Sequence, residues 1–395
     1  MYFKNLDGLR FIAAIFVIIG HCQSILYNQF HIRTYSPWGE KLANFGVDFF
    51  FVLSGFLISF LLLKELKTSG TIKIRNFYIR RALRLWPLYF LVGIFALLTA
   101  EPILTWMGIV SRGPVGVEWF ANFLYLGLFS INFQILLGHT NEFSSPTLGH
   151  FWSLSVEEQF YLFWAPALLL FKRVPFWFIV AMVFVGALFT LTKFNFYDYY
   201  FEKNAWAASN YFTLCRFYHF GLGAFVAYIV LNINSIKENI DNFLVTNTDI
   251  NLLNIKILQI FRSKYLAYFI QILFLYPFCN YLFGKHYCDD TEERILHGLL
   301  SVGIIFTAII PYSLFPFEVK ILKYLGKISF GIYIFHLFAI HVVLKLLLDA
   351  GFLVENLDFQ ILFPLFAAVL AVGIATLSFE KIEKPILKLK ARFER

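Results

Sequence analysis

The sequence predicts an all-α, polytopic membrane protein, and three observations carry that prediction. Of its 395 residues, 59% are hydrophobic and only 15% are charged, whereas soluble domains carry about 25% charged residues. The mean hydropathy is +0.69. Apolar runs of about 20 residues, the length that crosses a bilayer as a helix, recur along the chain. This composition excludes a disordered chain, a collagen and a small disulfide scaffold, and it argues against a soluble globular enzyme.

Ten apolar segments are predicted to span the membrane. In chain order they are residues 9–28, 44–63, 85–100, 156–171, 175–192, 211–232, 265–284, 295–315, 328–348 and 359–379. An eleventh candidate covers residues 118–138. No internal repeat and no Pro-, Ser- or Gly-rich linker marks a second domain. We therefore expect a single transmembrane domain over 1–395 that ends in a short basic cytoplasmic tail at 380–395.

The distribution of basic residues predicts the orientation of these segments. With ten spans and a cytoplasmic N-terminus, the cytoplasmic segments hold 24 Lys and Arg residues against 7 in the outer segments, as the positive-inside rule requires. If 118–138 crossed fully, the basic tail at 380–395 would face outward, so we expect 118–138 to be interfacial or re-entrant on the outer side. Both termini are then cytoplasmic. The net charge of +8 is explained by topology, and no nucleic-acid partner is expected.

Cysteines and the N-terminus indicate neither a metal centre nor a cleaved leader. The four cysteines are scattered without CxxC or Cys/His ligand spacing, so no metal site is expected. The first apolar run lacks a small-residue cleavage site and is expected to be a retained helix. The candidate functional residues are therefore the polar ones within apolar segments, because such residues are costly in a membrane and usually face a cavity.

Arg10 and His21 lie on one face of the first predicted helix. Their spacing of eleven residues is close to three full turns, with a rise of about 16 Å. Arg10 would lie at the cytoplasmic rim and His21 near the middle of the bilayer. The cation could hold an anionic ligand whose reactive end reaches the histidine. Equally, Arg10 could serve topology alone and His21 could be a hydrogen-bonded histidine of the helix bundle.

The second and third segments add a carboxylate and a basic cluster. Asp48 lies among phenylalanines and could pair with an arginine or histidine or bind an acceptor hydroxyl. Arg80, Arg81 and Arg84 share a helix face just before the third span. They could bind lipid headgroups, as topology alone requires, or a polyanionic cytoplasmic ligand. In the sixth segment, Arg216 and His219 could line a pore or form a structural pair.

The start of the fourth segment carries two adjacent carboxylates. Ser155 and Glu158 have the spacing of a capping box, which predicts a helix start at Ser155. Glu157 has no such structural explanation. Together with Trp152 and His150, these carboxylates could perform acid–base chemistry or bind sugar hydroxyls.

A polar stripe in the ninth segment predicts a cavity wall. Ser329, Tyr333 and His336 follow one another at i, i+4 and i+7 on a helix rich in Phe and Ile, and so share a face. A buried histidine with a satisfied hydrogen bond is the simpler reading of His336 alone. We expect all three to contact substrate or line a pore, together with Trp152 and Ser153.

Six motifs in order give the chain a resemblance to a known family. Between Leu6 and Pro385 the sequence reads LDGLRFIAA…GH, GVDFFFVLSGFLIS, FYIRRALRLWPLY, FWSLSVEEQFYL, ISFGIYIFH and SFEKIEKP. This series resembles the acyltransferase 3 family of integral membrane acyltransferases, which often O-acetylate extracytoplasmic glycans. The resemblance covers nearly the whole chain.

The resemblance implies a cytoplasmic acyl-CoA donor, most often acetyl-CoA, and an acceptor on the outer side. It implies that His21 is the catalytic histidine and that Arg10 guides the CoA part of the donor. The matching motifs extend these roles to further positions: a basic motif at Arg80, Arg81 and Arg84, an acidic motif at Glu157 and Glu158, and polar positions at Asp48, Tyr333 and His336. Some family members carry a fused C-terminal hydrolase-like domain. We expect a stand-alone form here, with a separate periplasmic partner as one option.

The sequence therefore predicts an O-acyltransferase of the bacterial inner membrane, surrounded by lipid and acting on a glycan or lipid-linked saccharide. His21 could be the general base or could carry the acyl group itself. The acceptor, the acyl group and the oligomeric state stay open. The alternative is a transporter or flippase of an anionic or glycan substrate, although the sequence shows no inverted repeat and no paired broken helices.

Overall fold

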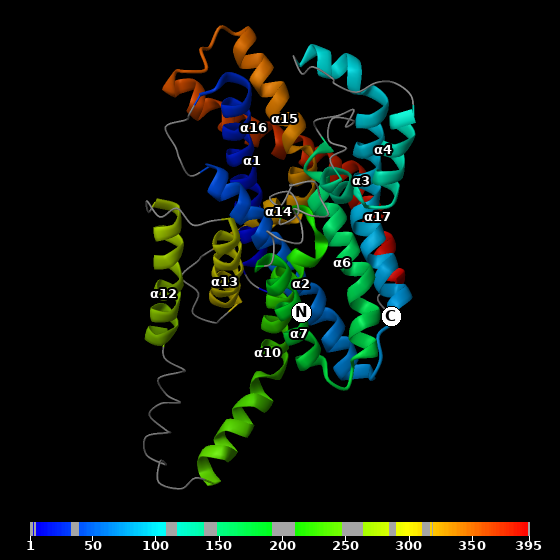
Figure 1. The fold of residues 1–395 in the computed structure, drawn as a ribbon, viewed down its shortest axis with the longest axis vertical. Helices are drawn as coiled ribbons and strands as arrows, with labels where there is room; N and C mark the ends of the chain where they lie inside the picture. The colour runs from blue at the N-terminus through cyan, green and yellow to red at the C-terminus, as the bar shows by residue number, and fades with distance from the viewer. Residues whose placement is uncertain are drawn as a thin grey trace.

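The computed structural model describes the chain except for residues 1–2, 4, 33–38, 108–116, 138–147, 192–209, 247–263, 284–289, 310–316, 318 and 394–395. Within the described residues every element is a helix and no strand occurs. Most of the long helices run along the longest axis of the molecule (Figure 1). The chain is therefore an all-α protein, as the sequence predicts.

Helix α2 (Gly39–Ser69) forms the centre of the bundle. It packs against α1 (Leu6–Phe30), α10 (Thr213–Thr246) and α13 (Asp290–Ile309). Of the residues in its most apolar stretch, 72% are buried, whereas in the corresponding stretch of α3 (Ile74–Trp106) only 22% are buried. Because α2 contributes side chains in several directions, it forms a wall shared by the cavity and the polar cluster described below.

Glycines allow α2 and α10 to approach backbone to backbone. A Cβ at Gly223 of α10 would lie 2.0 Å from the carbonyl oxygen of Val52, and one at Gly55 of α2 would lie 2.2 Å from the carbonyl oxygen of Phe220. Small residues at helix crossings let helices pack closely inside membranes. This contact fixes the distance between two helices that also share a buried ion pair.

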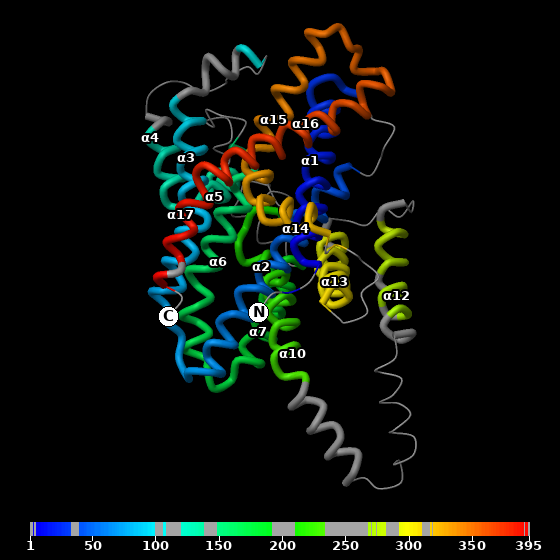
Figure 2. The backbone as a smooth tube through the Cα atoms, turned by 180° about the vertical axis from the view of Figure 1, so that it is seen from behind, coloured from blue at the N-terminus to red at the C-terminus, as the bar shows by residue number. Residues whose placement is uncertain are grey.

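A second group of helices completes the bundle. Its members are α6 (Phe151–Leu170), α7 (Pro175–Leu191), α12 (Lys264–Phe283), α14 (Lys320–Lys327), α15 (Ser329–Asp349) and α16 (Leu357–Ser378). The chain then turns through the π-helix η3 (Phe379–Glu383), the short α17 (Lys384–Leu387) and the 3-10 helix η4 (Lys388–Phe393). Figures 1 and 2 both show this C-terminal part lying along α3.

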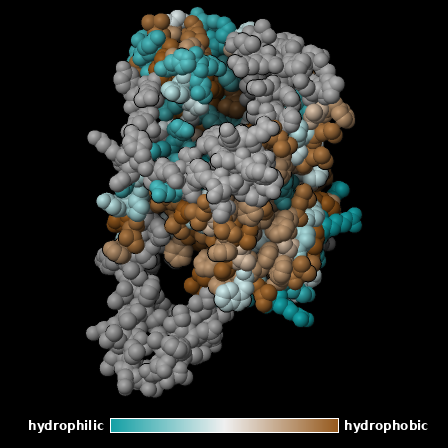
Figure 3. All heavy atoms as spheres, in the orientation of Figure 1, coloured by the Kyte–Doolittle hydropathy of each residue, from teal (hydrophilic) through white to brown (hydrophobic). Residues whose placement is uncertain are grey.

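The outer surface of the bundle is apolar. Large hydrophobic side chains are exposed on several helices, among them Trp177, Phe184, Phe269, Tyr276 and Val369. Hydrophobic residues also cover much of the lower half of the described face in Figure 3. Exposed apolar surface of this extent is unfavourable in water. It fits contact with lipid, so the chain is an integral membrane protein.

Each segment predicted to span the membrane corresponds to a helix, but fewer than ten of these helices are long and apolar enough to cross it. Each of the ten predicted segments overlaps a helix. Among the described residues, six helices are long and apolar enough to cross a membrane: α1, α2, α3, α10, α15 and the continuous stretch from α16 to Lys390. The four other predicted spans fall on α6, α7, α12 and α13.

The predicted interfacial segment 118–138 is broken into two short helices. These are α4 (Val117–Gly127) and α5 (Ile131–Leu136), and Phe129 between them has a positive φ of 50°. Eleven helical residues extend only about 16 Å, about half of a bilayer core. The segment is thus not a single spanning helix, which agrees with the interfacial or re-entrant placement expected from the charges.

The predicted helix start at Ser155 is wrong. Helix α6 begins at Phe151 with His150 at its N-cap, so Ser155 lies one turn inside and donates to the carbonyl oxygen of Phe151 at 3.1 Å. Glu158 accepts instead from Nε1 of Trp86 at 3.1 Å. Burial of Phe151 extends the helix by one turn beyond the polar pattern that suggested a capping box.

The glycine contact between α2 and α10 leads to a stability prediction. Gly223→Ala should destabilise the protein by about 1–3 kcal/mol, because the new methyl group overlaps the backbone of α2. Gly373→Ala on α16, where a Cβ meets nothing within 4 Å, should be neutral or slightly stabilising. Thermal unfolding of the detergent-solubilised variants measures both. Equal unfolding temperatures for the two variants would contradict this account of the helix contact.

Candidate active site

A cavity of about 410 Å³ lies between α1, α2, α3, α6 and α15. Its apolar lining includes Leu53, Leu57 and Leu85. Its polar lining consists of Asp7, Arg10, Ser54, Arg81, Arg84, Ser153, Glu157, Tyr161, Lys327, Ser329, Tyr333 and Lys390. The structure therefore brings together here seven of the site residues predicted from the sequence: Arg10, Arg81, Arg84, Ser153, Glu157, Ser329 and Tyr333.

Cations gather at one end of this cavity. Arg10 lies at the start of α1, where its Nη1 donates to Oδ1 of Asp7 at 3.1 Å. Arg81 and Arg84, one turn of α3 apart, face the same space. Arg80 points elsewhere: it does not line the cavity, and its Nη1 donates to the carbonyl oxygen of Phe393 at 2.8 Å. The structure thus separates Arg80 from the other basic residues predicted to bind the donor.

Glu157 and two hydroxyl groups form a polar cluster in the cavity wall. Oε1 of Glu157 accepts from the hydroxyl of Tyr161 at 2.5 Å and also from that of Ser54. The two hydroxyls are 2.8 Å apart. Glu158 does not line the cavity, because adjacent residues of a helix point about 100° apart. The adjacent carboxylates therefore have different surroundings, and only Glu157 faces the cavity.

A pair of hydroxyls links the cavity to the histidines of the predicted site. Ser153 Oγ and Tyr333 Oη are 2.6 Å apart, and Ser153 also donates to the carbonyl oxygen of His150 at 3.0 Å. The ring of His150 lies 4.6 Å from that of His336, edge to face. Tyr333 thus forms a wall with the cavity on one side and the imidazoles on the other.

His21 and His336 are hydrogen-bonded to each other behind this wall. His21 Nδ1 lies 2.8 Å from His336 Nε2, and His336 Nδ1 lies 2.5 Å from the carbonyl oxygen of Tyr333. A carbonyl oxygen only accepts, so Nδ1 of His336 carries the proton and, in the neutral ring, Nε2 accepts. His21 must then donate through Nδ1. The Nε2 of His21 is left with a free lone pair, which is the form required of a base or nucleophile.

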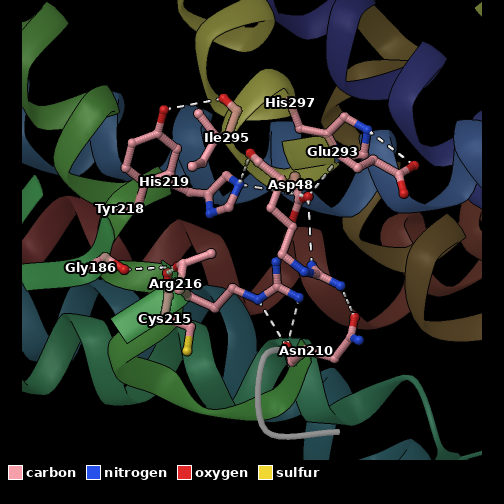
Figure 4. Close-up of polar contacts among 12 residues, drawn as sticks. Asp48, Gly186, Asn210, Cys215, Arg216, Tyr218, His219, Glu293, Ile295 and His297 are labelled. Atoms are coloured by element: carbon pink, nitrogen blue, oxygen red, sulfur yellow. Dashed lines mark hydrogen bonds and ion pairs between the residues drawn. The ribbon is translucent and has the colours of Figure 1, made fainter. Parts of the chain in front are cut away.

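Asp48 lies in a separate buried cluster (Figure 4). Its Oδ1 accepts from Arg216 Nη1 at 2.5 Å, and its Oδ2 lies 2.8 Å from His297 Nδ1. Arg294 is 3.9 Å from the same carboxylate, and Arg216 also donates to the carbonyl oxygen of Asn210 at 2.9 and 2.6 Å. None of these residues lines the cavity. Asp48, predicted as catalytic, thus contacts residues of α10 and α13 and does not line the cavity.

Trp152 connects the two sites without lining the cavity. The guanidinium of Arg216 lies 5.3 Å from the Trp152 ring and 5.4 Å from the ring of Phe51, which does line the cavity. Cation–π contacts of this kind stabilise a buried arginine. Trp152 therefore lies beside Arg216 and outside the lining of this cavity, and its contact with substrate stays a prediction.

The sequence did not single out several residues that the structure places in or beside the cavity. Tyr161 could have been found, because it follows Glu157 by one helical turn. Ser54 lies outside any spacing that points to it, whereas His150 stands in the same segment as the two carboxylates and was expected beside them. In the sequence, Lys327 and Lys390 look like lysines that the positive-inside rule alone explains. In the described residues, no group of three or more His, Cys, Asp or Glu side chains is arranged to hold a metal ion.

The sequence agrees with a known family over almost its entire length. A family model described as an acyltransferase domain, Acyl_transf_3, matches residues 3–379. The chain belongs to the acyltransferase 3 family. The histidine pair and the cavity lining other than Lys390 therefore lie within the matched acyltransferase domain, and the resemblance drawn from the six motifs is confirmed.

Named relatives of this acyltransferase 3 protein share only part of its length. A "Putative O-acetyltransferase" of Staphylococcus aureus (strain COL) is 36% identical over 166 residues, which are 41% of this chain and 24% of the relative. The "Peptidoglycan O-acetyltransferase OatA" of Listeria monocytogenes is 33% identical over 177 residues, 44% and 25% of the two chains. The matches thus span about a quarter of these relatives. No solved structure matches the chain.

The Asp48 cluster leads to a second stability prediction. Asp48→Asn leaves Arg216 buried without its counter-charge, which should cost about 3–5 kcal/mol. Asp349→Asn breaks an exposed pair with Lys345 and should cost less than about 1 kcal/mol. Unfolding temperatures and membrane abundance of both variants give the comparison. A stable, abundant Asp48→Asn protein without activity would instead favour a direct role in the reaction.

Proposed function

We propose that this protein transfers an acyl group, chiefly acetyl, from cytoplasmic acyl-CoA to a hydroxyl of an extracytoplasmic glycan or lipid-linked saccharide. The observation that carries the proposal is a single cavity that joins three kinds of lining. Arg10, Arg81 and Arg84 supply positive charge, leucines supply apolar surface, and Tyr333 lines the cavity while it contacts the His21–His336 pair. An acyl-CoA likewise combines phosphates, a pantetheine arm and a thioester.

The proposed reaction uses the free Nε2 of His21. The acceptor oxygen attacks the thioester carbonyl carbon, its proton passes to Nε2, and the sulfur–carbon bond breaks to release the thiolate of CoA, which takes up the proton. In the two-step version, Nε2 attacks the thioester carbonyl carbon and the sulfur–carbon bond breaks to release the CoA thiolate. The acceptor oxygen then attacks the acyl group on Nε2, the nitrogen–acyl bond breaks, and the proton of the acceptor hydroxyl passes to the thiolate. In both versions His336 holds His21 in the required tautomer. Glu157 would orient the acceptor or relay its proton.

The topology proposed for this reaction has ten spans and both termini in the cytoplasm, in the bacterial inner membrane. The basic end of the cavity supports this orientation, because it is built from the N-terminal end of α1, the basic start of α3 and the C-terminal η4. All three belong to segments in which the positive-inside rule expects Lys and Arg. The donor would then enter from the cytoplasm and the acceptor from the other side.

Loss of His21 tests the proposed function directly. A strain without its own copy of the gene is complemented with the wild-type protein, His21→Ala or His31→Asn, and alkali-labile acetate on its envelope glycans is measured at matched membrane abundance. His21→Ala should reduce the ester by about a hundredfold or more. His31, exposed at the end of α1, should be replaceable without loss.

Two outcomes would count against the proposal. Full ester with His21→Ala would remove His21 from the chemistry. An unchanged glycan with the wild-type protein, together with movement of an unmodified solute across the membrane, would favour a transporter.

His336 provides a test of the tautomer argument. His336→Gln keeps an oxygen that can accept from His21 Nδ1 and an amide that can donate to the Tyr333 carbonyl. We expect it to retain activity within about tenfold of the wild type. His336→Leu removes both contacts and should lose about a hundredfold, mainly in kcat. Steady-state rates of ester formation separate the two variants, and equal losses would show that His336 only fills space.

A further inference from the structure

The hydroxyl groups of Ser153 and Tyr333 form a hydrogen-bonded pair in the cavity lining. Ser153 lines the cavity from α6 and Tyr333 from α15, and both residues are buried. Their hydroxyl oxygens are 2.6 Å apart. The carbonyl oxygen of His150 is within reach of both, at 3.0 Å from Ser153 Oγ and 3.4 Å from Tyr333 Oη. Two hydroxyl protons are thus shared among three oxygen atoms.

Both protons of the Ser153–Tyr333 pair are used within the protein. A carbonyl oxygen only accepts, so one hydroxyl donates to the His150 carbonyl and the other donates to its partner hydroxyl. The shorter distance favours Ser153 as the donor to the carbonyl and Tyr333 as the donor to Ser153. In either arrangement both hydroxyls have donated and only lone pairs remain. The pair can therefore accept a hydrogen bond from a bound molecule but cannot donate one.

A second group in the same lining has also used its hydroxyl protons. Ser54 and Tyr161 both donate to Oε1 of Glu157, and a carboxylate accepts without donating. Among the serine and tyrosine hydroxyls of the described lining, Ser329 is the one that does not take part in these two groups. The polar lining therefore divides mainly into cations, which bind anions, and acceptors, which bind N–H or O–H donors.

An acyl-CoA presents groups that complement both parts of this lining. Its phosphates are anions, and its pantetheine arm carries amide N–H donors. Only two methylene groups separate the sulfur from the nearest amide nitrogen. Tyr333 is similarly close to the histidines, because its ring lies 5.3 Å from that of His336 and its carbonyl oxygen is 2.5 Å from His336 Nδ1. A thioester that reaches the histidines would therefore bring this amide near the hydroxyl pair.

We propose that the Ser153–Tyr333 pair accepts a hydrogen bond from the pantetheine amide N–H nearest the thioester, and so places the thioester beside the His21–His336 pair. This inference rests on the proposed function, since it assigns one contact of the same donor. Phe50 also lines the cavity, and its ring lies 6.0 Å from that of Tyr333. Beside such an apolar side chain, a ligand that lacks the N–H leaves the acceptor oxygen without a partner, which is unfavourable.

The test compares CoA with an analogue in which an oxygen atom replaces this amide nitrogen. The resulting ester has nearly the same shape as the amide but no N–H to donate. Binding of each ligand to the full chain is measured by calorimetry in nanodiscs of neutral phosphatidylcholine. The wild-type protein should bind the ester analogue about tenfold more weakly than CoA, the effect of one lost hydrogen bond.

Two variants of the pair should reduce this preference. Tyr333→Phe keeps the ring and removes the hydroxyl, so it should weaken CoA binding about tenfold and abolish the preference for CoA over the ester analogue. Ser153→Ala leaves the Tyr333 proton free to point at the ligand and should also lower the preference. Tyr218→Phe is the matched control, because it removes a hydroxyl that donates to the Ile295 carbonyl at 3.2 Å outside the cavity. It should bind both ligands like the wild type.

The outcomes separate this inference from the proposed function. If the wild-type protein binds CoA without preferring it to the ester analogue, or if Tyr333→Phe keeps the full preference, the assignment of the pair falls and the proposed function stands. If the wild type binds neither ligand, both fall. If Tyr333→Phe binds both ligands like the wild type but forms less glycan ester, the pair binds the acceptor hydroxyl, which overturns its assignment to the donor.

Discussion

The buried ion pair between Asp48 and Arg216 is the interaction on which the central helices depend. Both side chains are only 2% exposed, and a charge taken out of water is stable only when it is paired and hydrogen-bonded. Asp48 meets this condition through Arg216 and His297, on α10 and α13. The cluster can form only if α2, α10 and α13 meet at one place. It therefore specifies which helix faces pack together, which apolar side chains in a lipid bilayer specify poorly.

This pair also determines the back wall of the cavity. The Arg216 guanidinium lies against the rings of Phe51 and Trp152. Phe51 lines the cavity, and Trp152 precedes Ser153, whose hydroxyl contacts Tyr333. Tyr333 in turn offers the backbone carbonyl that orients His336 and, through it, His21. A chain of direct contacts thus runs from the structural ion pair to the histidine that carries the proposed chemistry.

Much of the fold follows from the sequence, and so do some of the site residues. Helix positions follow from runs of apolar residues, and the shared face of Arg10 and His21 follows from helical periodicity. What hydropathy cannot give is contact between distant segments: His21 and His336 are 315 positions apart, and Asp48 and His297 are 249 apart. The helix start at Ser155 was misplaced for a related reason, because burial of Phe151 depends on helices that a local capping pattern does not include.

The basic residues show why a sequence alone does not reveal which Lys and Arg side chains bind a ligand and which only set the membrane topology. The positive-inside rule places Lys and Arg at cytoplasmic ends whether or not they touch a ligand. Charge alone therefore does not distinguish the roles of Arg80, Arg84 and Lys390. Only geometry distinguishes them. Arg84 and Lys390 face the cavity, whereas Arg80 binds the backbone of the C-terminal segment. The same basic residues can therefore set the topology of the chain and also line its cavity, provided that the helices turn some of them inward.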